Sequence, residues 1–113
     1  KEEWRRRLWD DYVWVEGQMR KRWDSLVCVV ILGHARPTER HDDFFKPLKD
    51  VIVEFDRPVL YVHGDGHKYE RLNRMMGLKN IVKVQVDAGK RGPPLKIKVV
   101  RDYEDPWEFE RVY

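Results

Sequence analysis

The chain has 113 residues, of which 42% are hydrophobic, 38% charged and 12% aromatic, and its formal net charge is +3. This balance excludes a disordered or collagen-like chain and leaves room for one domain with a modest core. The single cysteine, Cys28, excludes an internal disulfide and a cysteine-rich zinc module, and its apolar surroundings indicate a buried thiol rather than a nucleophile. The longest apolar run, Leu26–Leu32, is far shorter than the roughly 20 residues of a membrane span.

The first predicted element is a long amphipathic helix, which Asp24-Ser25 ends. Its apolar residues recur every three or four positions, the spacing of one helix face. They are Trp4, Leu8, Tyr12, Val15, Met19 and Trp23. The apolar run Leu26–Leu32 then predicts a strand covered on both faces, as in the parallel part of an α/β sheet.

A second helix is predicted to begin at Asp42-Asp43, because acids favour the N-terminus of a helix. Its apolar face contains Phe44, Phe45, Leu48, Val51, Ile52 and Phe55. Arg57-Pro58 ends this helix, and Val59–Val62 predicts a second buried strand. Strand, helix and strand at this spacing predict a βαβ unit with two parallel strands.

The rest of the chain predicts one short helix and several strands. The helix spans Tyr69 to Met76 and ends at Gly77. Residues 81–86 and 95–100 alternate in polarity, which predicts antiparallel strands with one exposed face, and a weaker last strand covers residues 107–112. The predicted fold is therefore α/β, a βαβ unit followed by antiparallel strands, in a single domain of residues 1–113.

Charge is unevenly distributed in the last third of the chain. Residues 79–101 contain seven Lys or Arg and one acid, whereas residues 102–113 contain five acids and one base. The basic stretch is consistent with an anionic partner, but the favoured interpretation is a solvated sheet face balanced by the acidic tail. Nucleic-acid binding ranks last, because no aromatic residues are interleaved with the lysines of the predicted strands.

Three of the four histidines are placed directly after predicted buried strands. His34 follows the first strand, and His63 and His67 follow the second, in the sequence His-Gly-Asp-Gly-His with Asp65 at its centre. Parallel neighbouring strands end at the same edge of a sheet, where ligands bind in open α/β folds. Imidazole and carboxylate are ligands of zinc, iron and manganese, so the set predicts a metal site. The alternative is that these histidines form ordinary loop hydrogen bonds.

Other polar residues near this edge have weaker assignments. Arg36 and His63 are candidates for contacting a phosphate, and Tyr69 is an alternative candidate or a local hydrogen-bond donor. His41 lacks a comparable setting and is interpreted as an exposed loop residue.

The order of these elements resembles the carboxyl-terminal half of calcineurin-like metallophosphoesterases. The resemblance is carried by the aromatic helix, the strand ending in Gly33-His34, and the later strand followed by Gly64 and, three residues on, His67. It implies a layered α/β/β/α sandwich and two divalent or trivalent transition metals, with His34 on one metal and His67 on the other. Asp65 stands where the family has the first histidine of Gly-His-x-His, and it is a substitute ligand or a neighbour of one.

The resemblance covers about half of the family's domain. None of the family's amino-terminal motifs, Asp-x-His, Gly-Asp and Gly-Asn-His, occurs upstream of His34, and position 1 is Lys rather than Met. We therefore expect either a fragment of a phosphoesterase acting on a phosphorylated substrate, or a non-catalytic subunit of a larger assembly. Both expectations include another polypeptide, or the missing amino-terminal half, covering the sheet edge at Leu26–Leu32.

Overall fold

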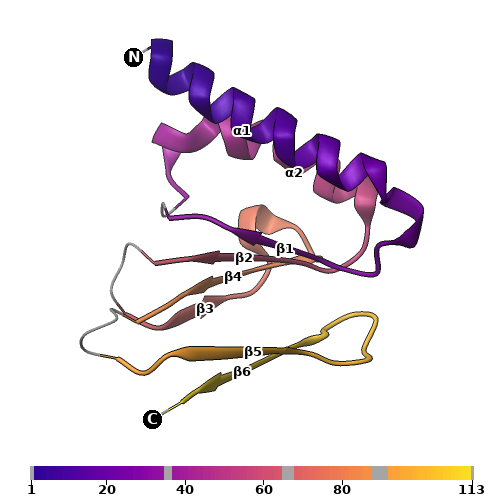
Figure 1. The fold of residues 1–113 in the computed structure, drawn as a ribbon, viewed down its shortest axis with the longest axis vertical. Helices are drawn as coiled ribbons and strands as arrows, with labels where there is room; N and C mark the ends of the chain where they lie inside the picture. The colour runs from indigo at the N-terminus through magenta and orange to yellow at the C-terminus, as the bar shows by residue number, and fades with distance from the viewer. Residues whose placement is uncertain (1, 35–36, 65–67, 88–91, 113) are drawn as a thin grey trace. The chain divides into compact units, whose positions relative to one another are not determined.

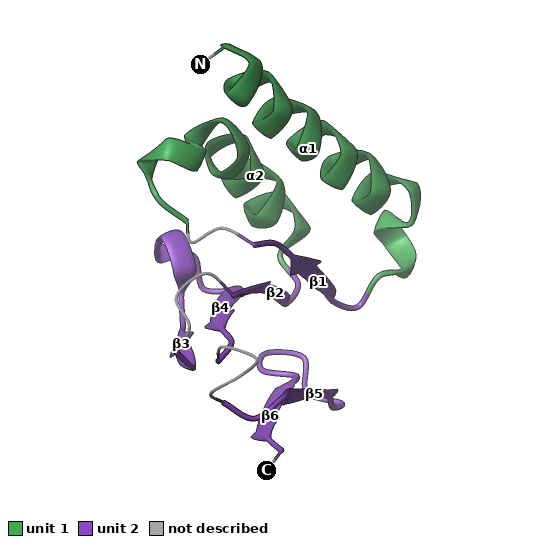
Figure 2. Cartoon of the chain, turned by 60° about the vertical axis from the view of Figure 1, so that its left-hand side comes forward, with its two compact units in different colours: residues 1–26, 37–56 green, residues 27–36, 57–113 purple. Residues whose placement is uncertain are grey.

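The computed structural model describes residues 2–34, 37–64, 68–87 and 92–112. The chain divides into two compact units, one formed by residues 1–26 and 37–56 and the other by residues 27–36 and 57–113 (Figure 2). The helices belong to the first unit and the strands to the second. Helices and a mixed sheet together make an α/β fold, as predicted. The layered α/β/β/α sandwich and the single domain remain predictions.

The helical unit contains α1 (Glu2–Lys21) and α2 (Asp42–Phe55), with short 3-10 turns η1 (Trp23–Ser25) and η2 (Glu39–His41). The two helices run side by side and parallel, because ion pairs join their corresponding ends. Arg5 contacts Asp43 at 3.0 Å near the start of each helix, and near the end Arg20 donates to the Glu54 carboxylate through both terminal guanidinium nitrogens.

The predicted apolar faces of the two helices are largely confirmed. Buried residues from both helices are Leu8, Tyr12, Met19, Phe45, Leu48, Val51, Ile52 and Phe55. The ring of Trp23 packs edge-on against Phe55, with centroids 5.2 Å apart. Trp4 is the exception, because it is 44% exposed and its indole N–H donates to the carbonyl of Arg40. No helix among the described residues is long and apolar enough to cross a membrane.

The second unit is built from a four-stranded mixed sheet in the order β1-β2-β4-β3 (Figure 1). These strands are β1 (Val29–Leu32), β2 (Val59–His63), β3 (Glu70–Leu72) and β4 (Ile81–Gln85). The pairs β1–β2 and β2–β4 are parallel, and β3 pairs with β4 antiparallel. The chain passes from β1 through α2 to the parallel strand β2, so the βαβ connection is confirmed.

A separate hairpin of β5 (Leu95–Val99) and β6 (Trp107–Arg111) faces this sheet. Both strands were predicted. The core between the two sheets contains Leu60, Val62 and Val84 from the larger sheet and Trp107 from the hairpin. The carboxylate of Asp102 fixes the hairpin connection by accepting hydrogen bonds from the N–H groups of Glu104 and Asp105, at 2.9 and 3.1 Å.

Three predictions of secondary structure are wrong or wrong in part, and the first is a helix. The short helix over Tyr69 to Met76 is replaced by β3 and the turn η3 (Met75–Gly77). The backbone of β3 pairs with β4, from Glu70 opposite Gln85 to Leu72 opposite Lys83. A single short helical segment is marginal on its own, so sheet pairing determines the local structure.

The prediction that residues 81–86 form a strand with one exposed face is also wrong in part. β4 lies between β2 and β3, and Ile81, Val84 and Gln85 are buried. Lys83 is half-buried rather than exposed. A strand with a neighbour on each side and a hairpin against one face keeps little free surface, whatever its pattern of polarity.

The first strand also differs from its prediction. It begins at Val29 rather than Leu26, and it lies at the edge of the sheet. Val27, Val30 and Leu32 are 71%, 42% and 76% exposed. The expectation of a strand covered on both faces is therefore wrong for β1, whereas every residue of β2 is buried.

Candidate functional site

The candidate site lies where β1 and β2 end, because their parallel pairing brings the two carboxyl ends together. Leu32 is opposite Val62, and the N–H of Gly33 donates to the carbonyl of Val62 at 2.9 Å. His34 follows at the end of β1, and His63 is the last residue of β2. The expected juxtaposition of the two strand ends is confirmed (Figure 1).

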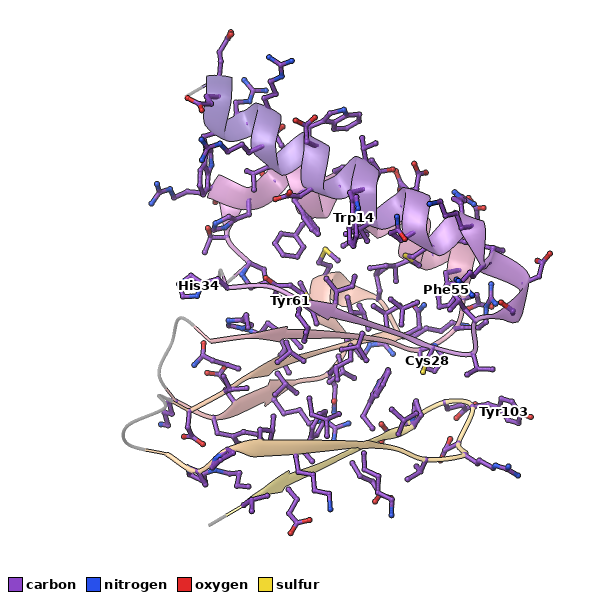
Figure 3. The ribbon with its side chains drawn as sticks, in the orientation of Figure 1. Trp14, Cys28, His34, Phe55, Tyr61 and Tyr103 are labelled. Atoms are coloured by element: carbon purple, nitrogen blue, oxygen red, sulfur yellow. The ribbon has the colours of Figure 1, made fainter. Side chains whose placement is uncertain are left out.

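The imidazole of His34 is exposed and projects from the end of β1 (Figure 3). The glycine before it is required by close packing. A Cβ atom at Gly33 would lie 2.4 Å from the hydroxyl oxygen of Tyr61 and 2.8 Å from its ring. Tyr61 is only 4% exposed, so its ring has little room to move. Gly33 thus allows the two strand ends to approach while His34 stays accessible to a ligand.

His63 has a different environment from His34. It is 1% exposed, and its ring stacks on Tyr61 with centroids 5.6 Å apart and an interplanar angle of 20°. In this structure the His63 ring packs inside the unit. That His63 contacts a phosphate remains a prediction.

Three of the predicted site residues, Arg36, Asp65 and His67, lie outside the described residues. The backbone directly after His67 is held by two side chains, those of Gln85 at the end of β4 and of Asp87 just beyond it. The side-chain amide of Gln85 donates to the carbonyl of Lys68 at 2.8 Å, and the N–H of Tyr69 donates to the carboxylate of Asp87 at 3.1 Å. Gln85 is 2% exposed. These two hydrogen bonds fix the backbone of residues 68 and 69, directly before β3.

Asp87 also ties the hairpin to the sheet. Its carboxylate accepts two hydrogen bonds from the guanidinium of Arg111, at 2.9 and 3.1 Å, in a side-on geometry. The same guanidinium lies over the ring of Tyr69, 5.5 Å from its centroid. Asp87 therefore accepts hydrogen bonds both from the chain directly before β3 and from β6. Sequence reasoning missed Gln85 and Asp87. Gln85 occupies an ordinary polar position of an alternating strand, so the one available signal was the single acid, Asp87, in a basic stretch.

The remaining histidine, His41, is in the helical unit. Its Nδ1 lies 3.1 Å from the hydroxyl oxygen of Thr38, and its ring packs at 59° against Trp4. It is half-buried and belongs to a 3-10 turn, so the interpretation as an exposed loop residue is wrong. These contacts give His41 a local structural role.

The thiol of Cys28 is half-buried rather than fully buried. Desolvation raises the pKa of Cys28 above the ordinary thiol value, which lowers the fraction of reactive thiolate. This agrees with the interpretation of Cys28 as a residue other than a nucleophile. It lines an apolar groove of about 410 Å³ together with residues 27, 99–103 and 106.

On the two strands of the hairpin, the lysines of the basic stretch lie opposite acids. Lys96 is the cross-strand partner of Glu110, and Lys98 is the partner of Glu108. Opposite charges at facing positions of an antiparallel pair stabilise it and neutralise each other. This pairing supports the interpretation of a balanced, solvated face on the hairpin strands.

Among the described residues, no group of three His, Cys, Asp or Glu side chains is placed to hold a metal ion. The described part of the predicted metal set is His34 alone, an accessible imidazole of the type that zinc, iron and manganese accept. Comparison with protein-family models, curated proteins and solved structures gave no match.

Proposed function

We propose that this chain carries part of the metal site of a metal-dependent phosphoesterase. The observation that supports this most is the parallel pairing of β1 with β2. This pairing brings Gly33-His34 next to the end of β2 at His63, the residue after which Asp65 and His67 follow in the sequence. The resemblance to calcineurin-like phosphoesterases suggests the chemistry, and the strand pairing supports a common sheet edge for the two strand ends.

In this proposal His34 holds one metal ion and His67 the other, with Asp65 as a ligand or as a hydrogen-bond partner of one. Two transition-metal ions (zinc, iron or manganese) at such a site activate water and stabilise the charge that develops on a phosphate ester. Further ligands must come from another polypeptide segment, so the chain is not expected to hydrolyse phosphate esters by itself. Gln85 and Asp87 contribute by anchoring the chain after His67.

Metal binding by the chain tests this proposal. After equilibrium dialysis against micromolar zinc, elemental analysis should find zinc bound to the unmodified chain and less of it in the His34→Ala and His67→Ala variants. His41→Ala is the matched control, because its contacts with Trp4 and Thr38 are local to the helical unit. Unchanged zinc content in both site variants, or equal loss in the control, would contradict the assignment.

The second candidate function is a non-catalytic, phosphoesterase-like subunit of a larger assembly. The observation that favours it is the exposed apolar edge at β1, a surface suited to a neighbouring polypeptide. This alternative predicts that the chain binds no zinc in the same dialysis experiment.

A further inference from the structure

The two edges of the four-stranded sheet have opposite chemical character. The β3 edge consists of Glu70, Arg71 and Leu72, so it carries both signs of charge. The β1 edge has no charged residue anywhere from Leu26 to Gly33. Sheet edges that face water usually carry charges, prolines or bulges, which discourage the addition of further strands. The β3 edge has such protection and the β1 edge lacks it.

On the side away from β2, the backbone of β1 has N–H and C=O groups in the orientation that a further strand would pair with. The N–H groups of Val29 and Gly33 donate inward, to the carbonyls of Pro58 and Val62, at 3.0 and 2.9 Å. Backbone groups alternate in direction along a strand, so those of Val30 and Leu32 point away from β2. In the described part of the chain, β1 pairs with β2 alone. Val30 and Leu32 thus offer two donors and two acceptors in an extended conformation.

The side chains beside this edge are apolar and accessible. Val30 and Leu32 are 42% and 76% exposed, and they alternate with Ile31, which is 8% exposed. The groove lined by Val27 and Cys28 opens next to the start of the strand and is bordered on the hairpin side by Val99 and Tyr103. A strand added to β1 would cover Val30 and Leu32, and the groove could accept an apolar side chain of that strand.

We infer that the edge of β1 binds an extended, uncharged strand of another polypeptide, which hydrogen-bonds to Val30 and Leu32 and extends the sheet to five strands. The occupant is uncharged because no residue of β1 could neutralise a buried charge. It is a strand rather than a helix because the edge presents unpaired main-chain groups in extended geometry. The metal proposal is not a premise of this inference, since no metal ligand contributes to the pairing.

A synthetic strand provides the probe. The ¹⁵N-labelled chain is titrated with a seven-residue peptide of alternating valine and threonine, blocked at both ends, and amide hydrogen exchange is followed by NMR. Exchange at Val30 and Leu32 should slow at least about tenfold as their N–H groups become hydrogen-bonded, while Arg71 on the β3 edge stays unchanged. A peptide with proline at its centre is the control, because it cannot pair along its full length.

Matched substitutions at the two edges sharpen the result. Leu32→Lys should weaken peptide binding about tenfold or more, whereas Leu72→Lys on the β3 edge should leave it within about twofold. Absence of protection at Val30 and Leu32, or equal protection at both edges, would overturn the inference. Concentration-dependent protection of β1 without peptide would also overturn it, because the occupant would then be a second copy of the chain.

Discussion

The neighbouring strands β1 and β2 have similar sequences and very different surroundings. Val29–Leu32 and Val59–His63 are both apolar runs that pair in parallel register. All five residues of β2 are buried, whereas Leu32 in β1 is 76% exposed. The difference arises because, among the residues that the structure describes, β2 has a strand on each side and β1 has one. This exposed apolar edge is the feature on which the proposed addition of a strand depends.

The largest expected effect is on stability, and it should separate the two strands. Leu60→Ala in β2 removes a side chain that is 0% exposed, and it should lower the free energy of unfolding by about 2–5 kcal/mol. Leu32→Ala in β1 should change it by less than about 0.5 kcal/mol, because that side chain is already in water. Urea unfolding followed by tryptophan fluorescence measures both. Similar losses would mean that Leu32 is covered in solution.

A smaller effect is expected where the two strands meet at the site. Gly33→Ala places a Cβ against the buried ring of Tyr61 and should destabilise the chain by about 1–3 kcal/mol. The control is Gly17→Ala in α1, where nothing lies within 4 Å of the added Cβ, and the same change should be stabilising by about 0.5–1 kcal/mol. In a Tyr61→Leu background the loss from Gly33→Ala should shrink. An unchanged loss there would exclude the ring as its cause.

The smallest expected effect concerns the thiol just before β1. Because burial raises the pKa of Cys28, its thiolate forms at higher pH in the folded than in the unfolded chain. The resulting stabilisation is complete below the unfolded thiol pKa and is lost as pH rises through the folded value. In alkaline solution the free energy of unfolding of the unmodified chain should therefore fall relative to that of the Cys28→Ser variant. A pH-independent difference in urea unfolding would contradict this.

The reactivity of thiols provides a companion measurement at the same edge. Ellman's reagent should modify Cys28 at least about tenfold more slowly than a cysteine introduced by Leu32→Cys in a Cys28→Ser background. Comparable rates would show that the groove beside Cys28 is open to reagents and that its thiol is not desolvated.

The amino-acid sequence by itself determined most of the local structure. The apolar periodicity predicted both helices, and the second apolar run predicted β2, because burial of one helix face or of a whole strand requires a recognisable pattern of residues. The two parallel strands followed from the length of the segment that joins them. The common edge for His34 and His63 followed in turn from that pairing.

Only the tertiary structure decided which strand lies at the sheet edge and which histidine is exposed. It also decided that residues 70–72 form a strand rather than part of a helix. An apolar run has the same sequence whether it has one neighbour or two, so β1 was predicted to be covered. Residues 70–72 became β3 because the free edge of β4 satisfies their backbone hydrogen bonds. His34 and His63 both follow or end apolar strands, yet one projects into solvent and the other stacks on Tyr61. Such differences depend on contacts between residues far apart in the chain, which local patterns of residues do not encode.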